Sequence, residues 1–547
     1  MAEESKQQPT WLENIQVNRR KFLALCAVGS MPVLLGACQT PVNANPGNTP
    51  PTIPAKPTLQ PTPTKAPVLT EADWSALAKN IKGTLLRPNN AQYATAHQLF
   101  DPQFDAIKPA GVVYCTSPKD VQTCLAFVER FNLPITARSG GHSYAGYSTT
   151  TGLLLDVSRM NSITLDTASG KATIGSGAKL IDVYAHLADN GRVIPAGSCP
   201  TVGISGLTMG GGVGVLGRKF GLTCDNLLSA QVVVADGRLV TCDANQNPDL
   251  YWALRGGGGG NFGIVTSFTF QTHPVDTLSI FTLGWAWQDA AAVVDAWQNW
   301  GPQAPDELWS NCLLLNTTDK NGDPIVRING VFVGGADPLN QQLQTLINKL
   351  GIAPTVRYVS SAGLLDTMLY EAGCSDKNLN QCRLPSQDPQ GQIQRNASAA
   401  KSDYFSKTMP RQGINALVNA IAQRQKSSLP NTGGIGIDTY GGAINRVAPD
   451  ATAFVHRNML FSIQYNANWD TDASAAIISQ NRTWLNNTWQ AMKPYASGAA
   501  YQNYIDPTLD NWQQAYYGNN LARLQKVKAT YDPKNVFRFK QSIPLAH

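Results

Sequence analysis

Two segments of the chain combine a reactive side chain with a glycine-rich backbone. The first, Arg138 to Ser143, contains Gly140, Gly141 and His142, and the second, Gly197 to Gly203, contains Cys199. Glycines can adopt positive φ, so that several backbone N–H groups converge on an anion such as a pyrophosphate. Taken separately, each segment is also compatible with a tight turn, a structural histidine or a buried thiol. Together they predict a large planar cofactor that is tethered at two points.

Two further stretches supply backbone without side chains. Residues 205–214 contain five glycines, and residues 256–260 are five consecutive glycines. Residues 205–214 have neither the lysine and Ser/Thr of a Walker loop nor an ordered G-x-G-x-x-G in a strand-to-helix context, so ATP and a Rossmann-bound dinucleotide are disfavoured. The glycine run at residues 256–260 predicts a flat ligand that lies directly on the backbone.

These segments resemble the flavin domain of the p-cresol methylhydroxylase and vanillyl-alcohol oxidase superfamily, and specifically the berberine bridge enzyme-like oxidases. The resemblance runs from about Val112 to Phe270 and resumes in motifs at residues 438–446, 461–465, 501–506 and 531–544. It implies an α+β fold, in which a two-part FAD-binding domain of the p-cresol methylhydroxylase type is joined to an αβ substrate domain with an antiparallel sheet.

The same resemblance implies FAD as the cofactor, bound bicovalently. His142 matches the histidine attached through the flavin 8α-methyl group, and Cys199 matches the cysteine attached at ring carbon 6. Such substituents make the ring a stronger hydride acceptor and hold it in place for reaction. The implied cofactor-binding residues are Arg138, Ser139, Gly140, Gly141, His142, Ser143, Cys199, Val202, Gly203, Gly206, Gly210, Gly211, Gly263, Val265 and Asn535.

Hydride removal from carbon needs a base that takes the proton from the neighbouring oxygen. Tyr504 matches the family's active-site tyrosine in an N-Y-x-D motif, and Gln464 lies on the strand that faces the substrate. A phenol is a weak base unless positive charge or hydrogen bonds favour phenolate, and the sequence does not place a nearby arginine or lysine. By the same resemblance, Asp438 is expected to orient or activate Tyr504, as a carboxylate does in sugar-oxidising relatives. A turn or N-cap role for Asp438 is the alternative. Tyr440 and Tyr501 are expected to line the pocket.

Val202 matches the family position whose bulk governs oxygen access, where valine accompanies oxidases. The sequence therefore predicts an FAD-dependent oxidase that acts on an alcohol or carbohydrate-like substrate, natural products included, and is reoxidised by O2 to give H2O2. Two alternatives stay open: a flavin dehydrogenase that uses a quinone or another carrier, and a non-catalytic envelope binding protein with the same fold. The tryptophans of the middle region are expected to fill the core, with a sugar-stacking surface as the alternative: Trp285, Trp287, Trp297, Trp300 and Trp309.

Composition narrows the possible partners. The 547 residues are too many for one hydrophobic core and predict two domains. A net charge of +6 on so long a chain is mild, so a small-molecule substrate is expected and nucleic acid is not. There is no C-x-x-C pair and the six histidines are scattered, so no metal site is predicted. Nothing in the sequence predicts an oligomeric state.

The amino terminus has the pattern of an export signal. In residues 1–38, Asn18 to Leu23 resembles a twin-arginine motif, an apolar run follows, and Leu35 to Cys38 resembles a lipobox. This predicts export by the twin-arginine route and membrane attachment through a lipidated Cys38 at a bacterial cell envelope. A soluble exported protein cleaved nearby is the alternative. Residues 39–75 are rich in proline and threonine and predict a semi-rigid linker, with a glycosylated stalk as the alternative.

The remaining chain is divided into three parts. We expect an FAD-binding domain at residues 76–275, a substrate-binding domain at 276–498, and a C-terminal segment at 499–547 that returns to the FAD domain. Strands are predicted at residues 325–332 and 460–465, and helices at 289–300 and 338–350. Cys374 and Cys382 lie in a polar, loop-like stretch at a spacing that allows a small disulfide after export, whereas Cys115 and Cys124 fall on a predicted strand and helix.

Overall fold

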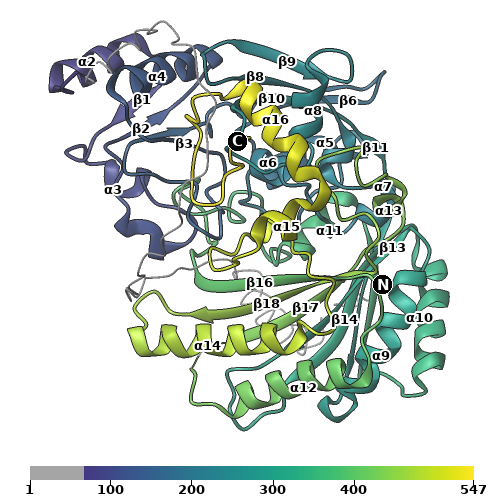
Figure 1. The fold of residues 1–547 in the computed structure, drawn as a ribbon. Coiled ribbons are helices and arrows are strands. Elements are labelled where there is room, and N and C mark those ends of the chain that lie inside the picture. Colours follow the sequence, from purple (N-terminus) through teal and green to yellow (C-terminus); the bar gives the residue numbers. More distant parts are fainter. Residues whose placement is uncertain (1–66, 431, 547) are drawn as a thin grey trace, which may run out of the picture.

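Four β-sheets organise the part of the chain that the computed structural model describes, residues 67–430 and 432–546 (Figure 1). The first sheet has the order β1 (Thr84–Leu86), β2 (Gly111–Tyr114), β4 (Leu153–Asp156), β3 (Ile135–Arg138). The second is antiparallel, in the order β5 (Ile163–Asp166), β6 (Lys171–Gly175), β10 (Ile264–Gln271), β8 (Leu227–Val233), β9 (Leu239–Asp243). A short pair joins β11 (His273–Pro274) to β7 (Arg192–Val193).

The fourth sheet is the largest and forms the lower half of the molecule in Figure 1. Its order is β15 (Val356–Ala362), β12 (Leu278–Trp285), β14 (Ile325–Val333), β13 (Leu308–Leu315), β17 (Gly433–Thr439), β18 (Phe461–Trp469), β16 (Ala397–Phe405). Every neighbouring pair in it is antiparallel. The α+β fold with an antiparallel sheet in the second region is therefore confirmed. Strand β14 covers the strand predicted at residues 325–332, and β18 covers the one predicted at 460–465 except Leu460.

Helices cover one face of this large sheet and leave the other face to the upper half of the molecule. The covering helices are α9 (Ala290–Trp300), α10 (Ala336–Leu350), α12 (Arg411–Lys426) and α14 (Ala475–Met492) (Figure 1). The other helices are α2 (Glu71–Asn80), α3 (Tyr93–Ala96), α4 (Pro118–Phe131), α5 (Leu180–Ala188), α6 (Ile204–Met209), α7 (Gly217–Phe220), α8 (Pro248–Ala253), α11 (Leu364–Glu371), α13 (Ala443–Arg446), α15 (Trp512–Tyr517) and α16 (Leu521–Tyr531). Helices α9 and α10 bear out the two helices predicted at residues 289–300 and 338–350.

Local sequence signals explain where α4 begins and ends. The Ser117 hydroxyl accepts a hydrogen bond from the Asp120 N–H at 3.3 Å, and Pro118 occupies the first helical position. Asn132 ends the helix in the left-handed conformation, with φ of 51°. The helix buries Val121 and Leu125 and links the parallel strands β2 and β3, so the segment that follows β3 begins at a fixed point.

The C-terminal segment is held against the upper half by buried polar groups. The Lys528 ammonium donates to the Asp532 carboxylate at 2.6 Å, to the Asn261 carbonyl at 2.8 Å and to the Phe537 carbonyl at 2.5 Å. The Asn261 side-chain oxygen accepts from the Ile543 N–H at 2.8 Å. Because Asn261 follows the glycine run, these bonds join the end of the chain to the backbone beside that run.

The amino-terminal predictions lie largely outside the described residues. The proposed signal, Cys38 and most of the linker fall there, so the structure does not test them. Helix α2 begins at Glu71, because Thr70 and Asp73 form a reciprocal capping box. The last five residues of the predicted linker are thus helical. Within the described part of the chain, no helix is both long and apolar enough to span a membrane.

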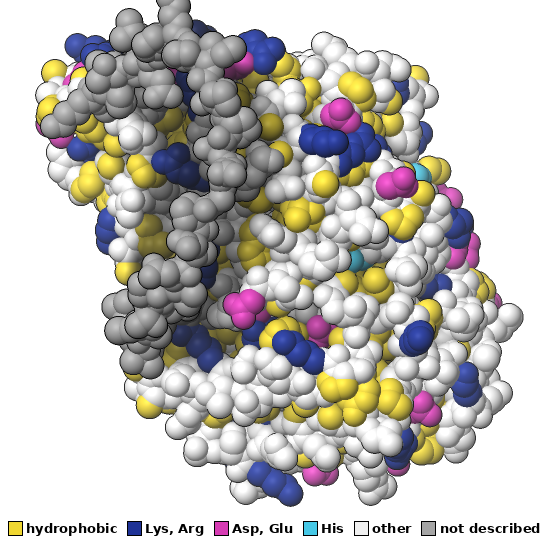
Figure 2. Space-filling model, in the orientation of Figure 1, with side chains coloured by type: hydrophobic (Ala, Val, Ile, Leu, Met, Phe, Trp, Pro, Cys, Tyr) yellow, Lys and Arg dark blue, Asp and Glu magenta, His cyan; other side chains and the backbone are white. Residues whose placement is uncertain are grey.

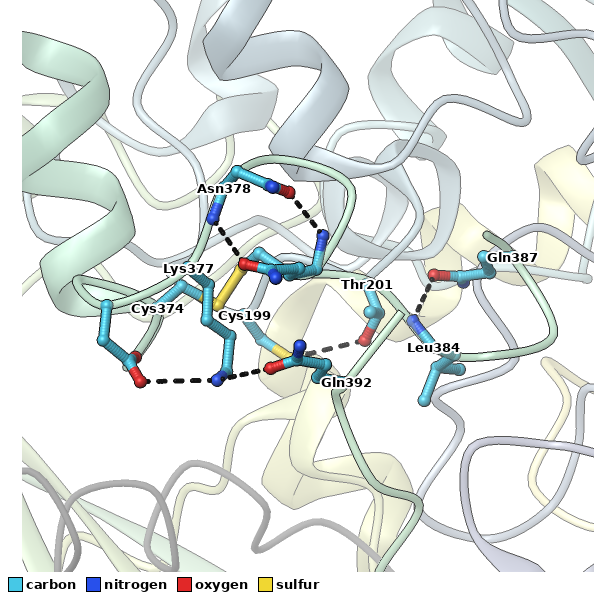
Figure 3. Close-up of a disulfide and its surroundings, with 11 residues drawn as sticks. Cys199, Thr201, Cys374, Lys377, Asn378, Leu384, Gln387 and Gln392 are labelled. Atoms are coloured by element: carbon cyan, nitrogen blue, oxygen red, sulfur yellow. Dashed lines mark hydrogen bonds and ion pairs between the residues drawn. A yellow bond between two sulfur atoms is a disulfide. The ribbon is translucent and has the colours of Figure 1, made fainter. Parts of the chain in front are cut away.

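Cys374 and Cys382 form the predicted disulfide, with their Cα atoms 5.8 Å apart. Both half-cystines are buried in a small apolar cluster with Ile181 of α5. Figure 3 shows the disulfide-closed loop close to Cys199 and Thr201. Cys115 and Cys124 are buried free thiols.

Charged side chains are dispersed over the face of the molecule seen in Figure 2. Lysine and arginine occur there singly or in small groups between neutral side chains. Among the described residues, no group of three His, Cys, Asp or Glu side chains is placed to hold a metal ion.

Candidate active site

A cavity of about 380 Å³ lies between the upper half of the molecule and the open face of the seven-stranded sheet. Such a volume is typical of a site for a small molecule. The upper wall comes from the segments that contain His142 and Cys199, from α6 and from the end of the glycine run. The opposite wall comes from the sheet and from α11: it contains Trp309, Asn311, Leu313, Glu371, Asp438 and Gln464.

The segments that contain His142 and Cys199 touch each other through glycine backbone. A Cβ at Gly140 would lie 2.2 Å from the Gly203 nitrogen, and a Cβ at Gly203 would lie 2.4 Å from the Gly140 nitrogen. Only glycine fits at both positions. Gly141 takes the expected positive φ, 73°, but Gly140 does not, so the expectation that both glycines form an anion nest through positive φ is wrong for Gly140. Glycine is needed at position 140 because the two segments approach each other closely.

His142 is a neutral, restrained imidazole. Its ring stacks on Phe100 with centroids 4.1 Å apart, and its Nε2 lies 2.9 Å from the Thr201 hydroxyl. Burial and the nearby Lys179 ammonium lower the pKa of His142 to about 3, although a hydrogen bond with the Thr201 backbone opposes the shift. The imidazole therefore keeps a free lone pair over the whole physiological pH range.

Cys199 lines the same cavity and shares the Thr201 hydroxyl with His142. The Cys199 sulfur lies 3.9 Å from the Thr201 oxygen. Burial raises the pKa of the Cys199 thiol, and hydrogen bonds from Thr201 and from the Val202 backbone oppose that rise. An imidazole and a thiol thus reach one cavity from two segments, as the sequence predicts.

Most of the predicted cofactor-binding residues line the cavity. These are Ser139, Gly140, Gly141, His142, Ser143, Cys199, Val202, Gly203, Gly206, Gly263 and Val265. Four others, Arg138, Gly210, Gly211 and Asn535, are not among its lining residues.

The four residues outside the lining have structural contacts instead. Arg138 is buried against Asp156 at 2.5 Å and donates to the carbonyls of Ala96 and Gln98. A Cβ at Gly210 would collide with Asn503, which is why glycine is needed there. A Cβ at Gly211 would likewise collide with the Phe454 ring. Asn535 takes a left-handed turn conformation with φ of 51°.

The glycine run meets the cavity only at its end. Gly259 and Gly260 line the cavity, whereas Gly256, Gly257 and Gly258 pack against protein atoms. A Cβ at Gly256 would lie 2.3 Å from the Phe454 nitrogen. The expectation that a ligand lies on the whole run is therefore wrong for its first three members.

Tyr504 lies in the cavity wall between two other tyrosines. It stacks on Tyr144 with ring centroids 5.5 Å apart and meets the edge of Tyr501 at 4.9 Å. The Tyr144 hydroxyl accepts a hydrogen bond from the Gln464 amide at 3.0 Å. The predicted residues Tyr504 and Gln464 are thus brought together through Tyr144.

Asp438 lines the cavity at the end of a row of polar side chains across the sheet. Thr282 donates to Asn329 at 2.8 Å, and Asn329 donates to Asn311 at 3.2 Å. Asn311 in turn hydrogen-bonds Asp438, which lies opposite it on β17. Burial raises the pKa of Asp438 to about 7; the Asn311 bond lowers it and the neighbouring Glu371 raises it further.

Tyr501 and Tyr440 occupy different surroundings. Tyr501 lines the cavity, and its hydroxyl accepts from the backbone N–H groups of Gly212 and Val213 at 3.0 and 3.2 Å. Burial raises the pKa of Tyr501 to about 12, so it is a neutral phenol. Tyr440 is fully buried against Tyr404 and is not among the lining residues, which corrects the expectation for this residue.

Several lining residues were not assigned a role by sequence reasoning. Tyr144 lies two positions after His142, so its place in the same motif was the available signal. Trp309, expected in the core, is 7% exposed, lines the cavity and has an indole N–H without a hydrogen-bond partner among the described residues. Asn311 and Glu371 lie in no motif and reach the cavity only through the sheet and α11.

These features suit a bound flavin. The upper wall offers glycine backbone, where a Cβ at Gly206 would meet no atom within 4 Å and would project into open space. His142 and Cys199 bring an imidazole nitrogen and a sulfur atom to the same wall. The polar groups of the sheet lie on the opposite wall of the cavity.

Comparison with known proteins agrees with this geometry. The family model described as FAD binding domain matches residues 109–243, and the model described as berberine and berberine like matches residues 500–544. The chain is 35% identical over 443 residues to an uncharacterized FAD-linked oxidoreductase, YgaK, of Bacillus subtilis, covering 80% of this chain and 91% of that protein. Its structure resembles Physcomitrella patens BBE-like 1 with a TM-score of 0.77, at 34% identity over 87% of this chain and 99% of that one. A chitooligosaccharide oxidase is similar with a TM-score of 0.76, at 28% identity over 87% of this chain and all of the other.

Proposed function

The chain belongs to the berberine bridge enzyme-like family of FAD-linked oxidoreductases, and we propose that it is an oxidase of carbohydrate-like alcohols. In this reaction a C–H group that carries a hydroxyl becomes a carbonyl, and O2 becomes H2O2. The observation that carries the proposal is one cavity with His142 and Cys199 on its upper wall and Tyr504, Asp438 and Gln464 around the rest.

We propose that His142 and Cys199 both bond to the flavin. When bound, FAD supplies the hydride acceptor that no side chain can provide. Both side chains line the cavity, and the neutral imidazole of His142 has the lone pair that a covalent bond needs. The backbone contact between Gly140 and Gly203 keeps the two segments at one place.

Tyr504 is the proposed base. As a hydride leaves carbon, the substrate hydroxyl must lose its proton to a group within hydrogen-bond reach. The Tyr504 oxygen takes this proton, and the rings of Tyr144 and Tyr501 fix the direction of the phenol. Asp438 is ionised above pH 7, and its negative charge then stabilises the proton that Tyr504 takes from the substrate. It therefore assists the transfer only in its ionised form.

A polyhydroxylated substrate fits the polar wall of the sheet. Asn311 and Gln464 both donate and accept hydrogen bonds, Asp438 accepts them when ionised, and the Trp309 indole N–H has no partner among the described residues. Such a mixture of donors and acceptors beside an indole suits the hydroxyl groups of a sugar ring. The similarity to a chitooligosaccharide oxidase supports this choice.

Oxygen is the proposed electron acceptor, because Val202 lines the cavity at the position associated with oxidases in this family. A quinone is the alternative acceptor. The reoxidation rate of the reduced enzyme in air, compared with the rate with an added quinone in the absence of oxygen, distinguishes the two.

We further propose that the protein works outside the cytoplasm. Residues 18–23 resemble a twin-arginine signal, and Cys38 follows a lipobox-like sequence. The Cys374–Cys382 disulfide supports this location, because such bonds persist mainly in oxidising compartments. Fractionation of cells that produce an R19K/R20K variant and a C38A variant tests the two steps separately: the first variant should stay in the cytoplasm, and the second should leave the membrane fraction.

A sugar panel on the purified protein tests the proposed function. The protein should be yellow, and the colour should remain with the denatured polypeptide. Neutral mono- and disaccharides, an amino sugar and an aryl alcohol are then compared by oxygen uptake and H2O2 formation. A colourless protein, or a flavoprotein that consumes no oxygen with any alcohol, overturns the proposal.

A further inference from the structure

Thr201 lies directly between the two side chains that are proposed to hold the flavin. Its hydroxyl oxygen is 2.9 Å from His142 Nε2 and 3.9 Å from Cys199 Sγ. Thr201 is fully buried and is not among the residues that line the cavity. It therefore contacts both tethering side chains from behind and has no access to a ligand.

The backbone around Thr201 leaves this hydroxyl little freedom. The Pro200 carbonyl accepts from the Ile181 N–H at 3.1 Å, and the Val202 carbonyl accepts from the Leu180 N–H at 3.0 Å. Both bonds anchor the turn to the first residues of α5. The His142 ring is restrained from its other side by the stacking contact with Phe100. The Thr201 hydroxyl on this fixed turn, together with the hydrogen bond to the Thr201 backbone, thus restrains the rotation of the imidazole.

The hydrogen-bonding capacity of a hydroxyl matches both neighbours at once. A threonine hydroxyl has one donor hydrogen and two acceptor lone pairs. It can accept from the Nε2–H of a neutral His142 and donate to the sulfur of Cys199. In this arrangement the lone pair of the imidazole is on Nδ1, and the hydroxyl hydrogen favours the thiolate over the thiol, as the opposing effect of Thr201 on the pKa of Cys199 indicates.

We propose that Thr201 is a positioning residue for the covalent attachment of the flavin, acting on His142 and Cys199 together. This inference rests on the proposed bicovalent attachment. Thr201 presents Nδ1 of His142 to the flavin methyl carbon and the sulfur of Cys199 to ring carbon 6.

The atoms and electrons of each attachment balance with O2 as the oxidant. At His142, an N–C bond replaces an N–H and a methyl C–H bond, and at Cys199 a C–S bond replaces an S–H and a ring C–H bond. Each bond releases two protons and two electrons, and one O2 takes them to become H2O2. The Thr201 oxygen is the nearest acceptor for the proton that His142 Nε2 gives up, because they are already hydrogen-bonded.

Substitution of Thr201 tests the proposal through the covalent bonds themselves. T201V replaces the hydroxyl by a methyl group of similar size, and T201S keeps the hydroxyl. T208V is the matched control, since Thr208 is equally buried on α6 but its hydroxyl donates to the Ile204 carbonyl, at 2.7 Å, within its own helix. The fraction of polypeptide that carries flavin after denaturation is followed by in-gel fluorescence and intact mass as protein produced without flavin is incubated with FAD and O2.

Each tether is measured alone in a background that lacks the other. T201V is combined with C199A to report the histidine bond and with H142A to report the cysteine bond. We expect covalent attachment to slow by about tenfold or more in both backgrounds. This is the effect of losing a hydrogen bond that stabilises a charge present in the reacting group or developing on it. T201S should restore most of the rate, and T208V should match the wild type. Circular dichroism and thermal unfolding confirm that each variant is folded.

The possible outcomes separate this inference from the proposed function. A wild-type protein that binds flavin without a covalent bond overturns the proposed attachment and the role of Thr201, whereas oxygen uptake in the sugar panel still decides the oxidase proposal. Wild-type attachment at two residues with an unchanged T201V rate overturns the role of Thr201 alone. A loss in T201V that T201S does not restore also overturns it, because the hydroxyl is then not the group that matters.

Discussion

The Asp438 carboxyl should make the rate of flavin reduction depend on pH. Its pKa of about 7 makes the carboxyl neutral at pH 5 and ionised at pH 9. If the ionised form assists proton transfer, the rate of flavin reduction should rise with pH and level off above about 7. Below that pKa the rate should fall by about tenfold for each pH unit, to about 1% of the plateau at pH 5.

D438N removes the titrating group without a large change in volume. We expect the plateau rate to fall by roughly 10²-fold or more and the pH dependence below 7 to disappear. The asparagine also removes a buried negative charge. The gap between the ordinary value of 3.8 and about 7 corresponds to about 4 kcal/mol at most, so D438N should stabilise the protein at pH 8.

The sign of this stability effect follows from proton binding. The folded protein binds the Asp438 proton more tightly than the unfolded chain does, so the carboxyl destabilises the fold increasingly as pH rises from 3.8 to about 7. D438N and the wild type should therefore be equally stable at pH 3.5 and differ most above pH 7. Chemical denaturation at several pH values measures the difference.

Asp403 provides a matched control on β16 of the same sheet. Burial also raises its pKa to about 7, but its carboxylate accepts hydrogen bonds from Tyr465 and Trp489 and is not among the residues that line the active-site cavity. D403N should keep the pH dependence of flavin reduction, measured by anaerobic stopped-flow absorbance with the best substrate of the sugar panel. A D438N enzyme within threefold of the wild-type rate, with the same acid limb, would refute the reasoning.

Three further variants test other parts of the molecule. Y504F removes the proposed base and should slow anaerobic flavin reduction by roughly 10²- to 10⁴-fold with little effect on substrate binding. V202L should slow reoxidation by O2, followed by the return of oxidised-flavin absorbance after mixing with air, and leave reduction nearly unchanged. C374S/C382S opens the short loop and should lower unfolding stability by about 2 to 3 kcal/mol in the chain-entropy model, seen as a lower midpoint in denaturant.

Controls and contradictory results differ among these three variants. Y501F alters the neighbouring phenol that the backbone already holds, so a loss equal to that of Y504F contradicts the choice of base. A V202L enzyme that reoxidises at the wild-type rate shows that oxygen reaches the ring by another route. For C374S/C382S, reductant should lower the wild-type stability to that of the variant; an unaffected wild type means that the bond contributes nothing.

Sequence reasoning reached the parts of the site that short motifs contain. His142 and Cys199 were identifiable because their residue types and glycine neighbours are local. Tyr144 was missed although it belongs to the same motif, because its role comes from Gln464, which lies far along the chain. Asn311 and Glu371 gave no local signal, since only strand pairing and helix packing bring them to the cavity.

The expectations that the structure corrects concern which atoms surround a residue. Arg138 and Gly140 lie in the predicted cofactor segment, but Arg138 is paired with Asp156 and the space for a Cβ at Gly140 is taken by Gly203, which periodicity and spacing do not show. The same applies to the first part of the glycine run at residues 256–260, where Phe454 and not a ligand excludes side chains at Gly256. A side chain can be excluded either by protein atoms or by a ligand, and the sequence shows a glycine in both cases.

The late position of several cavity residues in the chain has a consequence for biosynthesis. Gln502 to Ile505 and Phe539 line the cavity, and the bonds of Lys528 and Ile543 to Asn261 hold the segment that contains Phe539 in place. Synthesis must therefore pass Phe539 before the cavity wall is complete. We expect cofactor loading to follow synthesis of this segment, and a chain that stops before residue 502 to keep His142 and Cys199 but to have an open cavity.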